Sequence, residues 1–106
     1  MDTKKRKRLE HAGWRVGSAE GFLALTPDEL AILEMREALG RRVRELRESR
    51  NLTQSALAAA MGSSQSRVAK VEAGHPGVSL ELTIRALLSL GANRDDVGAC
   101  IASTAA

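Results

Sequence analysis

The sequence has almost no aromatic side chains: Trp14 and Phe22 are its only two, and it has no tyrosine. A folded core in this chain must therefore be aliphatic. The 106 residues are enough for one domain. Alanine, leucine, arginine and glutamate are abundant, and all four favour helices. We therefore predict an all-α domain.

Cysteine is also scarce. Cys100 is the only one, so no internal disulfide can form, and no cysteine–histidine cluster has the spacing of a metal site. No stretch approaches the roughly 20 apolar residues that span a membrane. Glu10, His11 and Arg15 interrupt the apolar core that a signal peptide would need after the basic start. We expect a cytoplasmic protein that holds neither a metal nor a cofactor, with Cys100 acting as a small apolar residue.

Enzyme signatures are missing from the sequence as well. We find no nucleophile next to a base, no suggestive pair of carboxylates, no phosphate-binding loop and no set of metal ligands. These absences predict that the chain is not an enzyme.

The positive charge is concentrated at the start of the chain. Residues 4–8 read KKRKR and Asp2 is the only acid among the first eight, so this stretch carries 5 − 1 = +4. The whole chain carries +3, which leaves 3 − 4 = −1 for the rest. The high isoelectric point therefore comes from this basic stretch and not from the rest of the chain. Two interpretations of the stretch stay open: a basic arm that contacts phosphates, and a solubilising tail.

Composition divides the chain into three segments. Residues 1–10 form a basic, flexible tail. Residues 11–37 form an N-terminal extension that ends in the first part of a long helix. In this extension the alternation of Trp14 and Val16 favours a short strand, and Ser18 favours the start of a short helix. Residues 38–103 form the helical domain itself.

Helix-start and helix-stop signals predict five helices. Thr26-Pro27-Asp28-Glu29 combines a cap, an N1 proline and a capping box, and the helix it starts reaches about Ser49. Gly40 is a weak point in it, because an interior glycine costs about 1 kcal/mol relative to alanine. The shorter helices are expected at 54–61, from Ser63 or Ser64 to residue 72 or 73, at 80–90 and at 93–101.

The second and third of these helices have the features of a helix-turn-helix. Their steep crossing needs a small residue, which Ala58 supplies, and the turn needs a residue that tolerates positive φ, which Gly62 supplies. Val68 and Val71 form the buried face of the later helix. Its other face carries polar residues suited to the major groove, namely Ser64, Gln65, Ser66, Arg67 and Lys70. An ordinary helical hairpin is the alternative for this segment.

The stretch LTQSALAAAMGSSQSRVAKVEAG, residues 52–74, resembles the helix-turn-helix of lambdoid phage repressors and XRE-like regulators. Their pattern L-[ST]-Q-x-x-L-A-x-x-x-G-[ST]-[ST]-Q-[ST]-x-[IV]-x-x-x-E-x-G is matched at every fixed position. The resemblance implies a lambda-repressor-like five-helix bundle that binds double-stranded DNA as a homodimer. It extends more loosely over residues 39–90. The family's polar stretch after the glutamate is replaced here by Ala73-Gly74-His75-Pro76-Gly77.

The resemblance also implies roles for single residues. Gln54 contacts a phosphate and braces Gln65, which reads a base, while Ser64, Ser66 and Lys70 face the groove. Whether Lys70 meets a base or a phosphate stays open. Arg47 and Glu72 take the places of a buried ion pair. Arg41, Arg42, Arg44 and Arg50 can meet phosphates or pair with neighbouring glutamates.

The layout of a basic start, a GWRVG segment, a capped helix and this motif is similar to HigA-type antitoxins. That similarity implies a RelE-like ribonuclease toxin, a small basic protein, as partner. The candidate partner-binding residues are Trp14, Val16, Phe22 and Leu23. Alternatively, the two aromatic residues form a small second core that packs on the long helix. A free-standing or phage-type regulator without a toxin is the alternative for the whole chain. For the dimer surface we expect residues 80–101, with Leu82, Leu87, Leu90 and Ile101 as candidates.

Overall fold

The computed structural model describes residues 24–103, and these residues form helices and loops. The helices are α4 (Pro27–Ser49), α5 (Gln54–Met61), α6 (Gln65–Glu72), α7 (Leu80–Ser89) and α8 (Arg94–Ala102). No strand occurs within this part of the chain. The predicted all-α fold with five helices is therefore confirmed. The chain divides into two units, residues 1–33 and 34–106, and the site described below lies within the second.

The expectations for residues 1–23 lie outside the described residues. They include the basic tail, the short strand or helix, and the four candidate partner-binding residues Trp14, Val16, Phe22 and Leu23.

Local hydrogen bonds and backbone conformations define the helix ends. At the start of α4, Thr26 N–H donates to Glu29 Oε1 at 2.9 Å and Glu29 N–H donates to Thr26 Oγ1 at 3.1 Å, a reciprocal capping box. Asn93 and Asp96 form the same kind of box at α8. Asn51, two residues beyond the end of α4, adopts a left-handed conformation with φ of 56°. This conformation turns the chain from α4 into α5.

Gly40 does not interrupt α4, contrary to the predicted weak point. The helix runs unbroken from Pro27 to Ser49, and Gly40 itself is buried. A Cβ atom added there would overlap the backbone oxygen of Val71 and lie 3.0 Å from that of Glu72. The glycine is therefore the residue that lets α4 approach the carboxyl end of α6.

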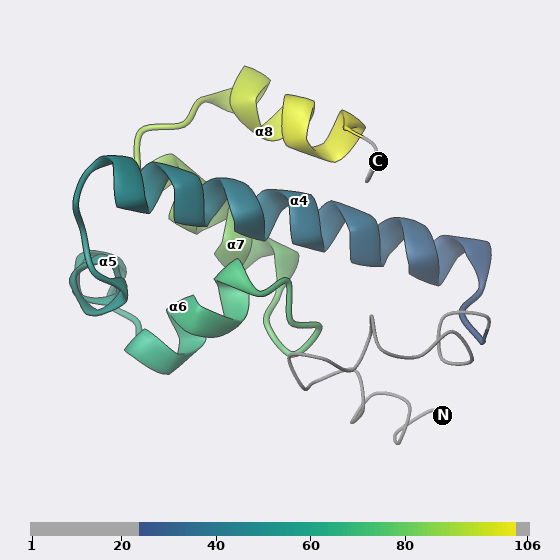
Figure 1. The fold of residues 1–106 in the computed structure, drawn as a ribbon, viewed down its shortest axis with the longest axis horizontal. Coiled ribbons are helices and arrows are strands. Elements are labelled where there is room, and N and C mark those ends of the chain that lie inside the picture. The colour runs from purple at the N-terminus through teal and green to yellow at the C-terminus, as the bar shows by residue number, and fades with distance from the viewer. Residues whose placement is uncertain (1–23, 104–106) are drawn as a thin grey trace. The chain divides into compact units, whose positions relative to one another are not determined.

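The core is aliphatic and is built from four of the helices and the loop before α7. Its buried side chains are Leu39, Val43, Leu57, Ala58, Val68, Val71, Val78, Ala86, Leu87 and Leu90. Figure 1 shows α6 on one side of α4 and α8 on the other. Helix α8 contributes no fully buried residue. Cys100 on α8 is half-buried against the core, and burial raises the pKa of its thiol.

Two of the four dimer candidates are wrong. Leu87 is 0% exposed and Leu90 is 1% exposed, so both belong to the core and neither can meet another chain. The apolar face of α7 is turned toward the core. Leu82 is partly buried against the core, and Ile101 is 40% exposed. Leu88, which the sequence did not single out, is 49% exposed.

Candidate nucleic-acid interface

A tight turn joins α5 to α6. Gly62 ends α5 with φ of 68°, in the left-handed region, and Ser63 N–H donates to the carbonyl of Ala58 at 2.8 Å. These features close the carboxyl end of α5. Ser64 then caps α6 by accepting from Arg67 N–H. Of the two serines predicted as caps, the structure selects Ser64.

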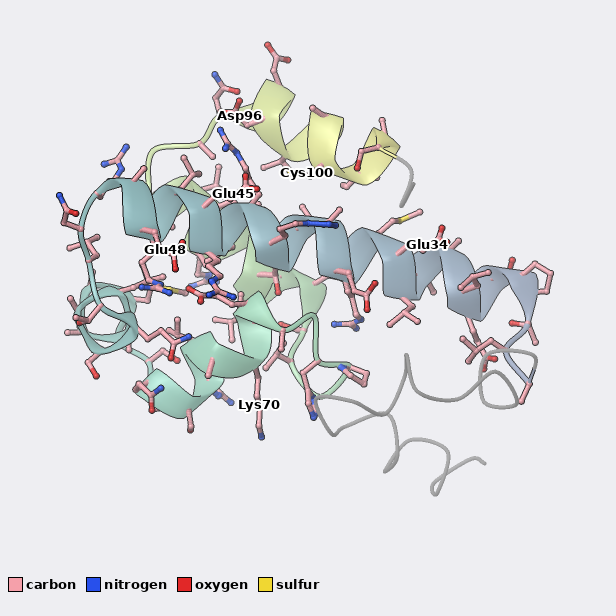
Figure 2. All side chains as sticks on the ribbon, viewed as in Figure 1. Glu34, Glu45, Glu48, Lys70, Asp96 and Cys100 are labelled. Carbon is pink, nitrogen blue, oxygen red and sulfur yellow. The ribbon has the colours of Figure 1, made fainter. Side chains whose placement is uncertain are left out.

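Helix α6 has one buried face and one exposed face. Val68 and Val71 are each 1% exposed and pack in the core. All five predicted groove-facing residues are exposed, namely Ser64, Gln65, Ser66, Arg67 and Lys70. Figure 2 shows the Lys70 side chain extending from α6 away from α4. The structure thus places four of these polar side chains at the amino end of α6 and Lys70 in its last turn.

Ser64 has less freedom than its neighbours on this face. Its hydroxyl oxygen accepts the backbone N–H of Arg67 at 3.3 Å and lies 3.4 Å from the Ser66 hydroxyl. The cap therefore occupies Ser64 from within the protein, and its first role is to begin the helix.

Arg47 and Glu72 form a bidentate ion pair between α4 and the last residue of α6. Arg47 Nε lies 2.6 Å from Glu72 Oε2, and Arg47 Nη2 lies 3.0 Å from Glu72 Oε1. Arg47 Nη1 also donates to the carbonyl of Leu52 at 2.8 Å. The two side chains are only 11% and 5% exposed. The hydrogen bond to Glu72, together with its negative charge, raises the pKa of Arg47 above its ordinary value despite burial.

Two glutamines continue from this ion pair to the exposed face of α6. Gln54 Nε2 donates to Glu72 Oε1 at 3.0 Å, and Gln65 Nε2 donates to Gln54 Oε1 at 2.7 Å. The structure therefore places Gln54 beside Gln65, in hydrogen-bond contact. The sequence pattern did not indicate that Gln54 also bonds to Glu72.

Grooves border α6 on both sides. One of about 270 Å³ is lined by Arg44, Arg47, Gln54 and Glu72 with two alanines. Another of about 420 Å³ is lined by Arg67, Arg85 and, between them in the chain, residues 77–79, 81 and 82. Arg44 also pairs with Glu48 at 3.1 Å, and Arg85 pairs with Glu81 at 2.8 Å. Sequence reasoning did not single out Arg85, which only the packing of α7 beside α6 brings near.

The loop after α6 is held by the protein itself. His75 Nδ1 accepts the N–H of Gly77 at 2.7 Å. Arg36 on α4 donates to the carbonyl of Val78, and burial lowers the pKa of Arg36. These two hydrogen bonds hold the loop after α6 in place. In this loop the sequence lacks the polar stretch of the repressors that it resembles.

Other kinds of site find no support in the described part of the chain. Among residues 24–103, no group of three histidine, cysteine or acidic side chains is placed to hold a metal ion. None of the helices described is both long and apolar enough to cross a bilayer.

A short helix held on a second helix, with a polar exposed face and a glycine turn, defines a helix-turn-helix module. The chain belongs to the helix-turn-helix domain family, whose sequence model matches residues 38–99, more than half of the 106 residues. This family membership implies DNA binding and is typical of regulators without enzymatic activity. No match was found among curated proteins or solved structures.

Proposed function

We propose that the chain is a sequence-specific transcriptional repressor in which α6 enters the major groove of its operator. The observation that carries the proposal is the exposed amino end of α6, where Gln65 stands free of the core and is held from behind by Gln54. A recognition helix reads bases with the residues at its amino end. The function needs no catalytic residue, metal or cofactor, and a repressor of this kind acts in the cytoplasm, where the chromosome lies.

Each exposed residue has a role in this proposal. Gln65 pairs with adenine through its amide, and Arg67 and Lys70 meet guanine or phosphate. Ser66 contacts bases or phosphates, and Ser64 supports it. Gln54 meets a phosphate with the N–H that it does not use for Glu72. Arg44 and Arg85 line the grooves on either side of α6 and add phosphate contacts.

Replacing Gln65 with alanine is expected to weaken operator binding by about 1–3 kcal/mol and to relax the preference at one base pair, because a bidentate base contact is lost. Fluorescence anisotropy with operator variants at fixed salt measures both effects. The control is Arg94→Ala, an exposed change on α8 that removes a positive charge far from α6 in sequence. If Gln65→Ala binds each operator variant as tightly as the wild type does, Gln65 does not contact a base and its assignment is wrong.

We further propose that the repressor is a homodimer. One recognition helix reads only about 4–5 bp, so a two-fold operator needs two half-sites about one DNA turn apart. With Leu87 and Leu90 assigned to the core, the apolar candidates on α7 and α8 are Leu82, Leu88 and Ile101.

The finer proposal is an antitoxin that neutralises a RelE-like ribonuclease toxin and represses its own operon. It is supported by the similarity of the chain's layout to HigA-type antitoxins, including the GWRVG segment at residues 13–17. In this proposal the N-terminal extension, with Trp14 and Phe22, binds the toxin, since large aromatic residues anchor interfaces. The alternative is a free-standing regulator with the same DNA-binding domain.

A tagged pull-down from the native cells distinguishes the antitoxin from the free-standing regulator. The antitoxin proposal predicts a stoichiometric, small, basic companion that is lost when residues 1–23 are deleted. This deletion leaves α4 and the bond from Arg36 to Val78 in place. A chain that elutes alone while it still binds its own promoter would contradict the antitoxin proposal and leave the free-standing regulator.

A further inference from the structure

We propose that Glu72, which is nearly buried, sets the base preference of Gln65 by fixing which way the Gln65 amide points. The inference rests on the proposed function and adds a positioning residue to it. Glu72 is linked to Gln65 through Gln54, with bonds of 3.0 Å and 2.7 Å. Only 5% of the Glu72 side chain is exposed, so any effect on base choice acts through other residues.

We call the hydrogen-bonded series Glu72–Gln54–Gln65 the relay. The donor and the acceptor of each hydrogen bond in it follow from the chemistry of the groups. An ionised carboxylate can only accept hydrogen bonds, whereas a glutamine amide can donate from nitrogen or accept at oxygen. The atom that Gln54 turns to Glu72 must therefore be Nε2, which leaves Gln54 Oε1 facing Gln65. Gln54 Oε1 can only accept, so the atom that Gln65 turns inward must be Nε2 as well.

The relay is anchored at its inner end. Arg47 holds both carboxylate oxygens of Glu72 and is itself bonded to the carbonyl of Leu52. A flipped Gln54 amide would set its oxygen against Glu72 Oε1, on a side chain that is only 5% exposed. That arrangement leaves two acceptors facing each other without a donor, which is costly in a mostly buried position. The ion pair thus keeps both hydrogen bonds of the relay in one direction, with each glutamine donating from Nε2 toward Glu72. We call this fixed direction the polarity of the relay.

This polarity leaves Gln65 with one free N–H and a free Oε1 toward the solvent. A donor and an acceptor side by side match N7 and the N6 amino group of adenine. Guanine presents two acceptors, N7 and O6, at the same edge, so O6 would meet Gln65 Oε1. A freely rotating amide can turn its N–H toward O6 instead. The relay is therefore expected to add discrimination of adenine against guanine beyond what the glutamine alone supplies.

The test compares adenine with guanine at the base pair that Gln65 reads. The operator is first selected from random duplexes by the full-length wild type. The base pair that Gln65 reads is then identified as the one at which Gln65→Ala no longer prefers any base. The wild type should favour adenine over guanine by roughly 5- to 150-fold, the range for one bidentate base contact. In Gln54→Ala, which leaves the ion pair intact, the ratio should fall to about 3-fold or less, since the amide can turn.

Controls separate polarity from affinity. Arg44→Ala alters the groove that Gln54 also lines without touching the relay, so it should change binding to both operators by the same factor. In a Gln65→Ala background, adding Gln54→Ala should leave the ratio unchanged. Glu72→Gln should relax the ratio like Gln54→Ala, because a neutral amide accepts either orientation of Gln54. If Glu72→Gln does not fold, the double variant Arg47→Met with Glu72→Leu carries the test, because it removes the carboxylate that orients Gln54 together with its charge partner; a folded double variant that keeps the full ratio would overturn the role of Glu72.

The possible failures are distinguishable. If the wild type selects an operator but Gln54→Ala keeps the full adenine-to-guanine ratio, the relay inference is overturned and the proposed function stands. If the wild type selects no sequence at all, the proposed function is overturned and the relay inference with it.

Discussion

Replacing Glu72 with alanine is expected to lower the free energy of unfolding by about 3–5 kcal/mol, because the mostly buried guanidinium of Arg47 loses its bidentate partner and keeps only the longer ion pair to the exposed Glu48, at 3.9 Å. The Arg47 side chain is 11% exposed and donates to both oxygens of Glu72. The bond to the Leu52 carbonyl satisfies one donor only. Urea unfolding followed by circular dichroism measures the loss.

A double variant shows where the loss comes from. Arg47→Met combined with Glu72→Leu removes both charges and keeps apolar volume, so it should recover most of the stability lost by Glu72→Ala. If the double variant is as unstable as the single one, the loss comes from packing at the α4–α6 contact and the account of a lost charge partner is wrong.

Replacing Leu87 with alanine is expected to cost about 2–5 kcal/mol, because it deletes most of a fully buried side chain and leaves a cavity. Leu87 is 0% exposed, and its neighbour Leu88 is 49% exposed. Leu88→Ala is the matched control and should change the free energy of unfolding by less than about 1 kcal/mol. Thermal or urea unfolding of the two variants gives the comparison.

The same pair of variants tests the correction to the dimer surface. Sedimentation of the folded variants should show that Leu88→Ala, and not Leu87→Ala, weakens self-association if this part of α7 lies in the dimer interface. Near-equal stability of the two variants would contradict the burial of Leu87 and restore it as a candidate for contact with another chain.

Local signals in the sequence predicted much of the fold. The capping box at Thr26 and the left-handed turn residue Gly62 follow from chemistry within a few residues along the chain. Because such signals are short-range, one sequence is enough to recognise them. The exposed face of α6 is predictable for the same reason, since Val68 and Val71 lie three residues apart on the opposite face.

Features that depend on contacts between helices were harder to predict. Gly40 is costly within an isolated helix, and only the approach of Val71 explains why it is there. The apolar residues of α7 share a spacing whether they face the core or a partner, so the pattern alone did not assign Leu87 and Leu90 to the core. The bond from Gln54 to Glu72 joins residues that are 18 positions apart, and no local pattern indicates it.

Selection of duplexes from a random pool by the full-length chain tests whether α6 reads DNA sequence. We predict enrichment of one two-fold symmetric sequence with half-sites about 10 bp apart. We also predict that Gln65→Ala relaxes one position in each half-site. Recovery of no enriched sequence, or of the same sequence with undiminished preference at every position by Gln65→Ala, would contradict the proposed function.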